Sequence, residues 1–215
     1  MATVVLVGFS TTGKSTVLRK IDDRPGGLVN TIDTDQLVAR DFSGHIFNIY
    51  LELVEGKDRS KALRYIEMRE EDMLASLEVG LNPSLIAAGP SLPIRKNWEV
   101  FCARLNPTCI FLNKSPEQIF EGLMKRRATH EKNKSIVESA AFGSWDEDLT
   151  TVFCNGKWVL VTRGEAVRNI QKHLNQRLGL YRRCAKAEYD TADILENKKL
   201  KIRFYKYLDD CLGVN

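Results

Sequence analysis

The sequence predicts an α/β fold in which a central parallel sheet of five strands carries helices on both faces. Short runs of β-branched and aliphatic residues recur along the chain and alternate with longer segments of helical periodicity. Several of these runs are apolar at successive positions, which is typical of strands buried on both faces. The length of 215 residues is that of one domain, and neither repeats nor low-complexity segments interrupt it.

The first half of the chain supplies three of the five strands. Strands are predicted at residues 3–7 (TVVLV), 28–32 and 84–88. Helices are predicted at residues 15–21, 35–55 and 60–77. The second helical segment is expected to break at Ser43-Gly44. The third has an apolar side made of Leu63, Ile66, Met73 and Leu74.

The second half contains a fourth strand at residues 108–112 and then a well-defined helix start. Ser115 has the position of an N-cap, Pro116 the first helical position and Gln118 the reciprocal capping-box position. This helix is expected to reach Arg127. Further helices are predicted at residues 164–177, 180–187 and 192–212, with Tyr189 closing a fifth strand.

Residues 128–162 differ from the rest and are predicted to be an insertion. Two β-like runs, residues 151–154 and 157–161, flank Asn155-Gly156. Asn-Gly is the strongest short hairpin signal, because both turn positions need a positive φ. We interpret this insertion as a lid that carries a β-hairpin, and the hairpin as a possible docking edge for a partner.

Charge and cysteine content exclude several classes of protein. Lys and Arg number 32 against 28 Asp and Glu, and the net charge of +4 is small for a nucleic-acid binder. The lysine-rich stretch of residues 198–206 is most simply a solvated helix face. No apolar run could cross a membrane, and the N-terminus does not have the pattern of a signal peptide. Five cysteines without a CxxC pair favour reduced thiols in a cytoplasmic protein. We expect this protein to be a monomer or a weak homo-oligomer.

The segment GFSTTGKS, residues 8–15, matches the phosphate-binding pattern G-x-x-x-x-G-K-[ST] between a strand and a helix. Glycines let the loop wrap around an anion, and backbone N–H groups at the helix start point at phosphates. Lys14 would reach the β- and γ-phosphates, and Ser15 would offer a hydroxyl to Mg²⁺. The residues expected to bind ATP here are Gly8, Ser10, Thr11, Thr12, Gly13, Lys14, Ser15 and Thr16.

Two carboxylates follow the second strand directly, as Asp33-Thr34-Asp35. Carboxylates two residues apart at a strand end can face one ligand, so that one holds a metal and the other accepts a proton from a hydroxyl. Alternatively, Asp35 only caps the next helix and Asp33 is an ordinary loop carboxylate. The residues alone do not decide between these roles.

With these motifs in order, the sequence resembles the shikimate kinase family over most of its length outside residues 128–162. Besides the phosphate loop and D-x-D, the similar segments are residues 63–67 (F-R-x-x-E in the family), 85–89, 111–117 (Y-L-x-x-S-P-E), 177–182 (R-x-P-L-Y-R) and Asp190-Thr191. The resemblance implies a P-loop kinase fold and ATP- and Mg²⁺-dependent phosphorylation of a small hydroxy acid. It implies that Lys14 and Asp35 are catalytic, that Asp33 orients Mg²⁺ through water, and that Arg64 and Arg177 hold the substrate carboxylate.

An arginine pairs with a carboxylate in a bidentate fork, so the last roles are chemically sound. Without the resemblance, Arg64 would be interpreted as pairing with Glu67 or Glu71, and Arg177 as capping a helix end.

The sequence departs from the family at two places. The glycine triplet expected at the acceptor floor reads Gly89-Pro90-Ser91, so only Gly89 matches, and Pro90 has no N–H to donate. The family's short arginine-bearing lid segment is missing, and Arg126 and Arg127 are the nearest candidates for a cation that reaches ATP. The first departure bears on the acceptor rather than on the nucleotide.

The sequence therefore predicts a kinase of a small hydroxy acid, with shikimate as the first candidate acceptor. Two alternatives stay open. One is a kinase of the same fold with another acceptor, such as a sugar acid, a nucleoside or an antibiotic. The other is a nucleotide-binding regulatory or interaction module, which the intact Lys14, Ser15, Asp33 and Asp35 argue against.

Overall fold

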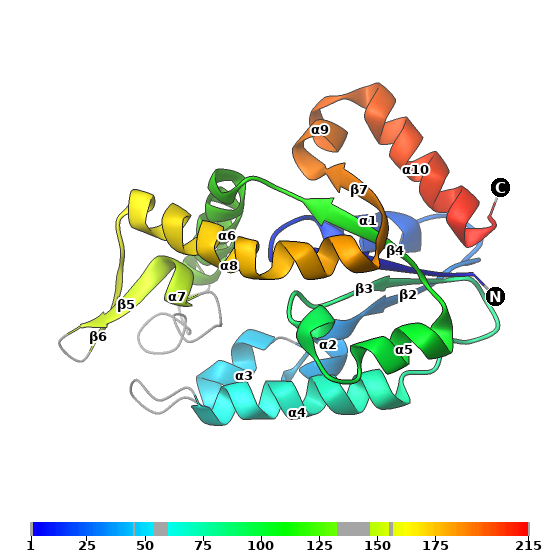
Figure 1. Cartoon of the computed structure of the whole chain (residues 1–215). Coiled ribbons are helices and arrows are strands. Elements are labelled where there is room, and N and C mark those ends of the chain that lie inside the picture. The colour runs from blue at the N-terminus through cyan, green and yellow to red at the C-terminus, as the bar shows by residue number, and fades with distance from the viewer. Residues whose placement is uncertain (1, 45, 54–59, 133–146, 155–156, 215) are drawn as a thin grey trace. The chain divides into compact units, whose positions relative to one another are not determined.

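The computed structural model describes residues 2–44, 46–53, 60–132, 147–154 and 157–214 of the chain (Figure 1). The chain divides into two compact units, each assembled from separate stretches of sequence. The first unit comprises Met1–Thr34, Glu71–Lys114 and Arg177–Asn215, and the second comprises Asp35–Glu70 and Ser115–Gln176. That the whole chain works as one kinase domain with a lid at residues 128–162 stays a prediction.

The first unit holds the predicted five-stranded parallel sheet. Its strands are β1 (Thr3–Val7), β2 (Asn30–Asp33), β3 (Ser84–Ala87), β4 (Thr108–Asn113) and β7 (Ala185–Asp190). They lie in the order β2-β3-β1-β4-β7, and every neighbouring pair is parallel. Strand β1 is buried at all five positions, as its unbroken apolar run requires. The predicted fold class is confirmed.

Helices of the first unit cover both faces of this sheet, with α9 and α10 on one side and α5 on the other (Figure 1). These elements are α1 (Lys14–Asp22), η2 (Leu92–Ile94), α5 (Trp98–Leu105), α9 (Thr191–Glu196) and α10 (Lys198–Leu212). On one face, Leu6 and Leu85 of the sheet pack with Val17 of α1 and with Phe204 and Leu208 of α10. This apolar layer fixes α1, and with it the loop that precedes α1.

The second unit is mostly helical. It contains η1 (Arg40–Phe42), α3 (Ile46–Leu53), α6 (Pro116–Lys132), α7 (Glu147–Thr150) and the hairpin strands β5 (Thr151–Cys154) and β6 (Lys157–Leu160). Helices α2 (Thr34–Val38), α4 (Ser60–Ser76) and α8 (Arg163–Cys184) have residues in both units. Each described helix is too short or too polar to cross a lipid bilayer.

Several local predictions for the second unit are confirmed. The helical segment after β2 breaks at Ser43 and Gly44, which both have a positive φ. At the start of α6, Ser115 Oγ accepts from Gln118 N at 3.3 Å, and Gln118 Oε1 accepts from Ser115 N at 3.0 Å. Strands β5 and β6 pair antiparallel, while the Asn155-Gly156 turn lies outside the described residues. Their role as a docking edge stays a prediction.

Other local predictions are wrong. Residues 185–187, predicted to be helical, begin β7, because Ala185 pairs with Cys109 of β4. The tail is two helices rather than one, since Asn197 ends α9 and caps α10 by accepting from Lys199 N and Leu200 N. The sequence pattern does not predict helix α5. Strand β2 begins at Asn30 instead of Leu28, whose side chain is exposed. Leu63, assigned to the apolar side of α4, is also exposed.

Candidate active site

The phosphate loop, residues 8–15, joins β1 to α1 in the first unit. At Gly8, φ is 148° and a Cβ atom would lie 2.3 Å from Leu112 O, so only glycine fits there. At Gly13, φ is 92°, which turns the chain into α1. Thr11 also has a positive φ, of 62°. Two of the three positive φ angles in the loop thus fall at the predicted glycine positions, and the third is at Thr11.

Side-chain donors hold the carbonyl groups of the loop. Lys14 Nζ donates to Gly8 O and Phe9 O, both at 2.8 Å, and Lys114 Nζ donates to Thr11 O at 2.9 Å. The Thr191 hydroxyl lies 2.8 Å from Thr12 O. The C=O and N–H of a trans peptide point in opposite directions. The N–H groups of these peptides therefore point away from the donors, as an anion-binding loop requires.

The predicted metal pair is assembled in the same unit. Ser15 Oγ, in the first turn of α1, donates to Asp33 Oδ2, at the end of β2, over 2.8 Å. A hydroxyl and a carboxylate oxygen at one point are the hard oxygen donors that Mg²⁺ takes, alongside waters and phosphate oxygens. Among the described residues, no three His, Cys, Asp or Glu side chains gather as a metal site. These residues fit a magnesium ion that is also held by phosphate, as in P-loop kinases.

Lys114 and Thr191 also contact the phosphate loop, although the sequence pattern gives neither of them a site role. Burial lowers the pKa of Lys114, and the Asp190 carboxylate partly opposes this effect. Lys114 follows β4, at the sheet edge where ligands of parallel sheets bind, and that position is the signal that the sequence offers. Both side chains line a cleft of about 140 Å³ next to Thr11 and Gly13, with Leu195 and Tyr205 among its apolar walls.

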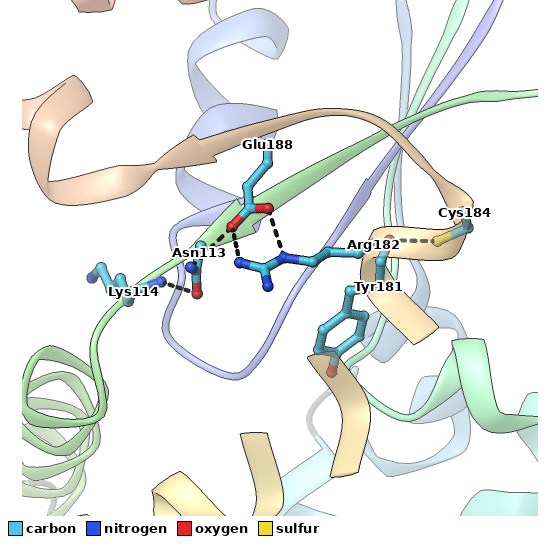
Figure 2. A network of polar contacts seen from close by, with 6 residues as sticks. All are labelled: Asn113, Lys114, Tyr181, Arg182, Cys184 and Glu188. Carbon is cyan, nitrogen blue, oxygen red and sulfur yellow. Dashed lines mark hydrogen bonds and ion pairs between the residues drawn. The ribbon is translucent and has the colours of Figure 1, made fainter. Parts of the chain in front are cut away.

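A polar network fixes the backbone that carries Lys114 (Figure 2). Asn113 Oδ1 accepts from Lys114 N at 2.8 Å, and Asn113 Nδ2 donates to Glu188 Oε1 at 3.2 Å. Glu188 of β7 in turn accepts two hydrogen bonds from Arg182, at 2.9 and 3.0 Å, and this pairing raises the pKa of Arg182. The end of β4 is therefore tied to the end of α8.

The acceptor floor, residues 89–91, follows β3 and is held by hydrogen bonds within the first unit. Thr34 Oγ1 donates to Ala87 O at 3.1 Å and accepts from Gly89 N at 2.7 Å. The Tyr181 hydroxyl donates to Pro90 O at 2.7 Å. Gly89 N–H is thus already bonded, and Pro90 has none. The backbone of this floor offers an acceptor molecule no donor at either position.

Arg177 packs on the buried side chain of Phe9, a residue of the phosphate loop, with its guanidinium carbon 5.7 Å from the centre of the Phe9 ring. It does not cap a helix end, because α8 continues to Cys184. Burial raises the pKa of Tyr181 to about 12, while the neighbouring Arg177 guanidinium partly lowers it. Tyr181 stacks on Phe111 of β4, with ring centres 5.2 Å apart. The first unit therefore brings Arg177, the acceptor floor and the phosphate loop together.

The remaining predicted residues belong to the second unit. Asp35 is half-buried in the first turn of α2, directly after Thr34, and its carbonyl accepts from Ala39 N. Arg64 is exposed on α4, and Arg126 is exposed on α6, where Arg127 also lies. The suggested Arg64–Glu71 pairing is not seen, since Glu71 accepts from the backbone N–H groups of Lys96 and Asn97.

Comparison with known proteins supports the fold. The chain matches no protein-family model, and no curated protein matches its sequence. Among solved structures, the shikimate kinase from Bacteroides thetaiotaomicron superposes with a TM-score of 0.58 at 18% identity, over 99% of each chain. The shikimate kinase from Acinetobacter baumannii in complex with shikimate gives 0.55 at 18% identity, over 96% of this chain and 94% of its own. The chain thus has the P-loop kinase fold.

Proposed function

We propose that this chain is an ATP- and Mg²⁺-dependent kinase that phosphorylates a hydroxyl group of a small anionic hydroxy acid. The observation that carries the proposal is the phosphate loop with its metal pair: Lys14 bonded within the loop, and Ser15 bonded to Asp33 at 2.8 Å. Ordinary core packing does not require a lysine turned back into the loop or a serine–aspartate pair at the start of the next helix. Both are the parts that P-loop enzymes use to hold the phosphates and Mg²⁺.

The nucleotide would bind with its phosphates on the loop and its base in the cleft that Lys114 and Thr191 line. Lys14 would leave the carbonyls of Gly8 and Phe9 for the β- and γ-phosphates, because these offer it a full negative charge. Mg²⁺, held between Ser15, Asp33 and the phosphates, would supply charge neutralisation at the transferring group. Arg126 or Arg127 would be the lid cation.

Asp35 would accept the proton of the acceptor hydroxyl as its oxygen bonds to the γ-phosphorus and the bond to the β-phosphate oxygen breaks. Arg177 and Arg64 would hold the acceptor's carboxylate. Support for Arg177 comes from its place over Phe9 of the phosphate loop. Catalysis would consist of positioning and charge neutralisation, since this transfer needs no covalent enzyme intermediate.

Shikimate is the first acceptor to test, and the floor gives a reason to test others. Gly89 N–H is bonded to Thr34 and Pro90 has none, so a ring hydroxyl would find no backbone donor at these positions. This observation favours a second candidate function, phosphorylation of another small acid or alcohol that is held by side chains alone. A sugar acid, a nucleoside and an antibiotic represent the range.

The test is a coupled ADP-release assay with Mg-ATP, run with and without each acceptor, beside calorimetry of ATP binding. Shikimate-dependent release would establish the first proposal, and release with another acceptor would establish the second. ATP binding without turnover of any acceptor would contradict both and favour a regulatory or interaction module.

A further inference from the structure

A large hollow lies between α1 and α10 in the first unit, and the kinase reaction makes no use of it. Its volume is about 710 Å³, within the range of pockets that hold cofactor-sized molecules. We call it the α1–α10 groove. It is lined by the end of α1, the segment that follows α1, and α10. The apolar lining residues are Ile21, Pro25, Leu28, Val29, Ile202 and Val214.

Cations surround this apolar lining. Arg24, Lys198, Lys201 and Lys206 line the groove, and Asp209 is the one carboxylate among its described lining residues. Asp209 already pairs with Arg24 at 2.6 Å. Within the part of the chain that the structure describes, the ammonium groups of the three lysines take part in no hydrogen bond or ion pair. The groove therefore has an apolar interior and an uncompensated positive charge.

An aromatic wall adds a second kind of contact. The Tyr205 ring has Lys20 Nζ 5.9 Å and the Arg24 guanidinium 5.8 Å from its centre, and it meets Phe204 edge-on at 5.2 Å. These contacts hold the ring in place at the side of the groove. Tyr205 and Lys201 also line the small cleft beside the phosphate loop, so the groove adjoins that cleft along α10.

We propose that the α1–α10 groove binds a small amphipathic anion, a molecule with an aromatic or compact aliphatic body and a phosphate, sulfonate or carboxylate group. The body would replace water over Ile21 and Ile202, and the anionic group would meet Lys201 and Lys206. Apolar burial supplies affinity in such pockets, and a few charged groups fix orientation. The groove and the cleft proposed for the nucleotide base share Lys201 and Tyr205, but the other groove residues do not line that cleft, so we expect both to be occupied together.

A solvated helix face and a lipid-binding surface both fit the groove less well than a small-molecule site does. A solvated face accounts for the lysines. It does not account for a hollow whose lining leaves the apolar side chains of Leu28 and Ile202 exposed over 66% and 58% of their surface. An anionic lipid surface would meet a raised face carrying apolar side chains, whereas this site is concave. The size of the hollow and the placement of its charges match a small molecule.

The probe for the test is 8-anilinonaphthalene-1-sulfonate, whose aromatic body and single sulfonate have the required chemistry. Its fluorescence is titrated with the full chain in the presence of saturating Mg-ATP. Methyl NMR of Leu28, Val29, Ile202 and Val214 then locates the bound probe. We expect one site, shifts confined to these methyl groups, and an affinity that falls as ionic strength rises.

The double variant K201E/K206E is expected to weaken binding about tenfold or more, because attraction becomes repulsion at both positions. I202D should weaken it by removing apolar contact. The matched control is K199E/R203E, which makes the same total charge change on the same helix at two exposed side chains that do not line the groove. It should alter the affinity less than about twofold. Thermal denaturation checks that each variant is folded.

Several outcomes would overturn the proposal. Equal affinity of K201E/K206E and the unchanged chain would remove the role of the lysines. Displacement of the probe by Mg-ATP would place it in the nucleotide site. Charge-dependent binding of phosphatidylglycerol vesicles or of an acidic peptide, without binding of the soluble probe, would make the groove a macromolecular surface. None of these measurements uses turnover, so K14M must bind the probe as the unchanged chain does, whatever becomes of the proposed kinase activity.

Discussion

The phosphate loop and the acceptor floor follow neighbouring parallel strands, β1 and β3, at the same edge of the sheet, but they use their backbones in opposite ways. In the phosphate loop, lysine side chains hold the carbonyls of Gly8, Phe9 and Thr11. The N–H groups of the same peptides point away from these lysines and are open to an anion. In the acceptor floor, the N–H of Gly89 is held and Pro90 has none.

This difference separates the part of the site that would bind any nucleoside triphosphate from the part that would select the acceptor. Every nucleoside triphosphate presents the same phosphates, so a loop of backbone N–H groups suits all of them. Acceptors differ in shape and in the placement of their hydroxyls, and a floor that offers no backbone donor at Gly89 or Pro90 must rely more on side chains to discriminate among them. We therefore expect changes at the two loops to affect the two substrates separately.

The largest effect is expected from K14M in the phosphate loop. The variant keeps most of the apolar stem of the side chain. It loses the positive charge that would stabilise the negative charge on the transferring phosphoryl group. We expect turnover to fall about a thousandfold or more. The measurement is steady-state ADP release with the best acceptor. K186M, which removes an exposed lysine of β7, is the matched control and should keep full activity. A K14M variant with near-normal kcat would refute the assignment of Lys14.

The next effect is expected from D35N, which tests the acceptor side. Asparagine keeps the shape and the helix position but cannot accept a proton. We expect kcat to fall about 100- to 10,000-fold. The Kd of ATP, from calorimetry, should stay within about twofold, because the phosphates bind elsewhere. D72N, an exposed carboxylate on α4, serves as control. Turnover retained in D35N would leave Asp35 as a helix-start residue and nothing more.

A smaller effect is expected from P90G, which restores an N–H to the floor. If the missing donor limits binding of shikimate, its KM should fall about tenfold, the value of one good hydrogen bond, while the KM of ATP is unchanged. Glycine also increases the conformational entropy of the unfolded chain, which lowers the free energy of unfolding by about 1 kcal/mol. P25G, in an exposed turn after α1, reproduces that cost away from the floor. An unchanged KM for every acceptor would show that Pro90 does not select the substrate.

The phosphate loop and the local elements could be predicted because each has a cause within a few residues. Gly8 and Gly13 are required by their own φ angles, and the capping box of α6 spans only Ser115 to Gln118. Helix α5 could not be predicted in this way. Asn97, at its N-cap, makes no side-chain cap, and the N–H of Asn97 is bound instead by Glu71, which is distant in sequence.

The rest of the site depends on contacts that a sequence pattern does not reveal. Lys114 meets Thr11 across 103 positions, and Tyr181 meets Pro90 across 91. The start of β7 has helical character in sequence, yet Ala185 joins β4 because the sheet edge offers unpaired backbone groups. The capped and glycine-marked elements and the nucleotide loop thus follow from local chemistry, whereas helix α5, the start of β7 and the acceptor floor depend on distant contacts in the folded chain.

The smallest effect is expected from Y181F, which removes the hydroxyl that holds Pro90 O. At neutral pH the free energy of unfolding of the variant should be about 1 kcal/mol lower than that of the unchanged chain, because a buried carbonyl loses its donor. The pKa of Tyr181 is about 12 in the folded chain and about 10 as the ordinary value. Folding therefore favours the neutral phenol.

The stabilisation by Tyr181 is complete below pH 10, where the phenol is neutral in both states. It decreases as the pH rises toward 12, because the unfolded chain releases the proton first. Urea denaturation of both proteins from pH 8 to 11.5 measures the difference. The unchanged chain should lose its advantage over Y181F across this range, and taking the difference between the two proteins cancels the general effect of alkali. A pH-independent difference would mean that the Tyr181 hydroxyl is open to water, and the acceptor floor would then be less rigid than the phosphate loop.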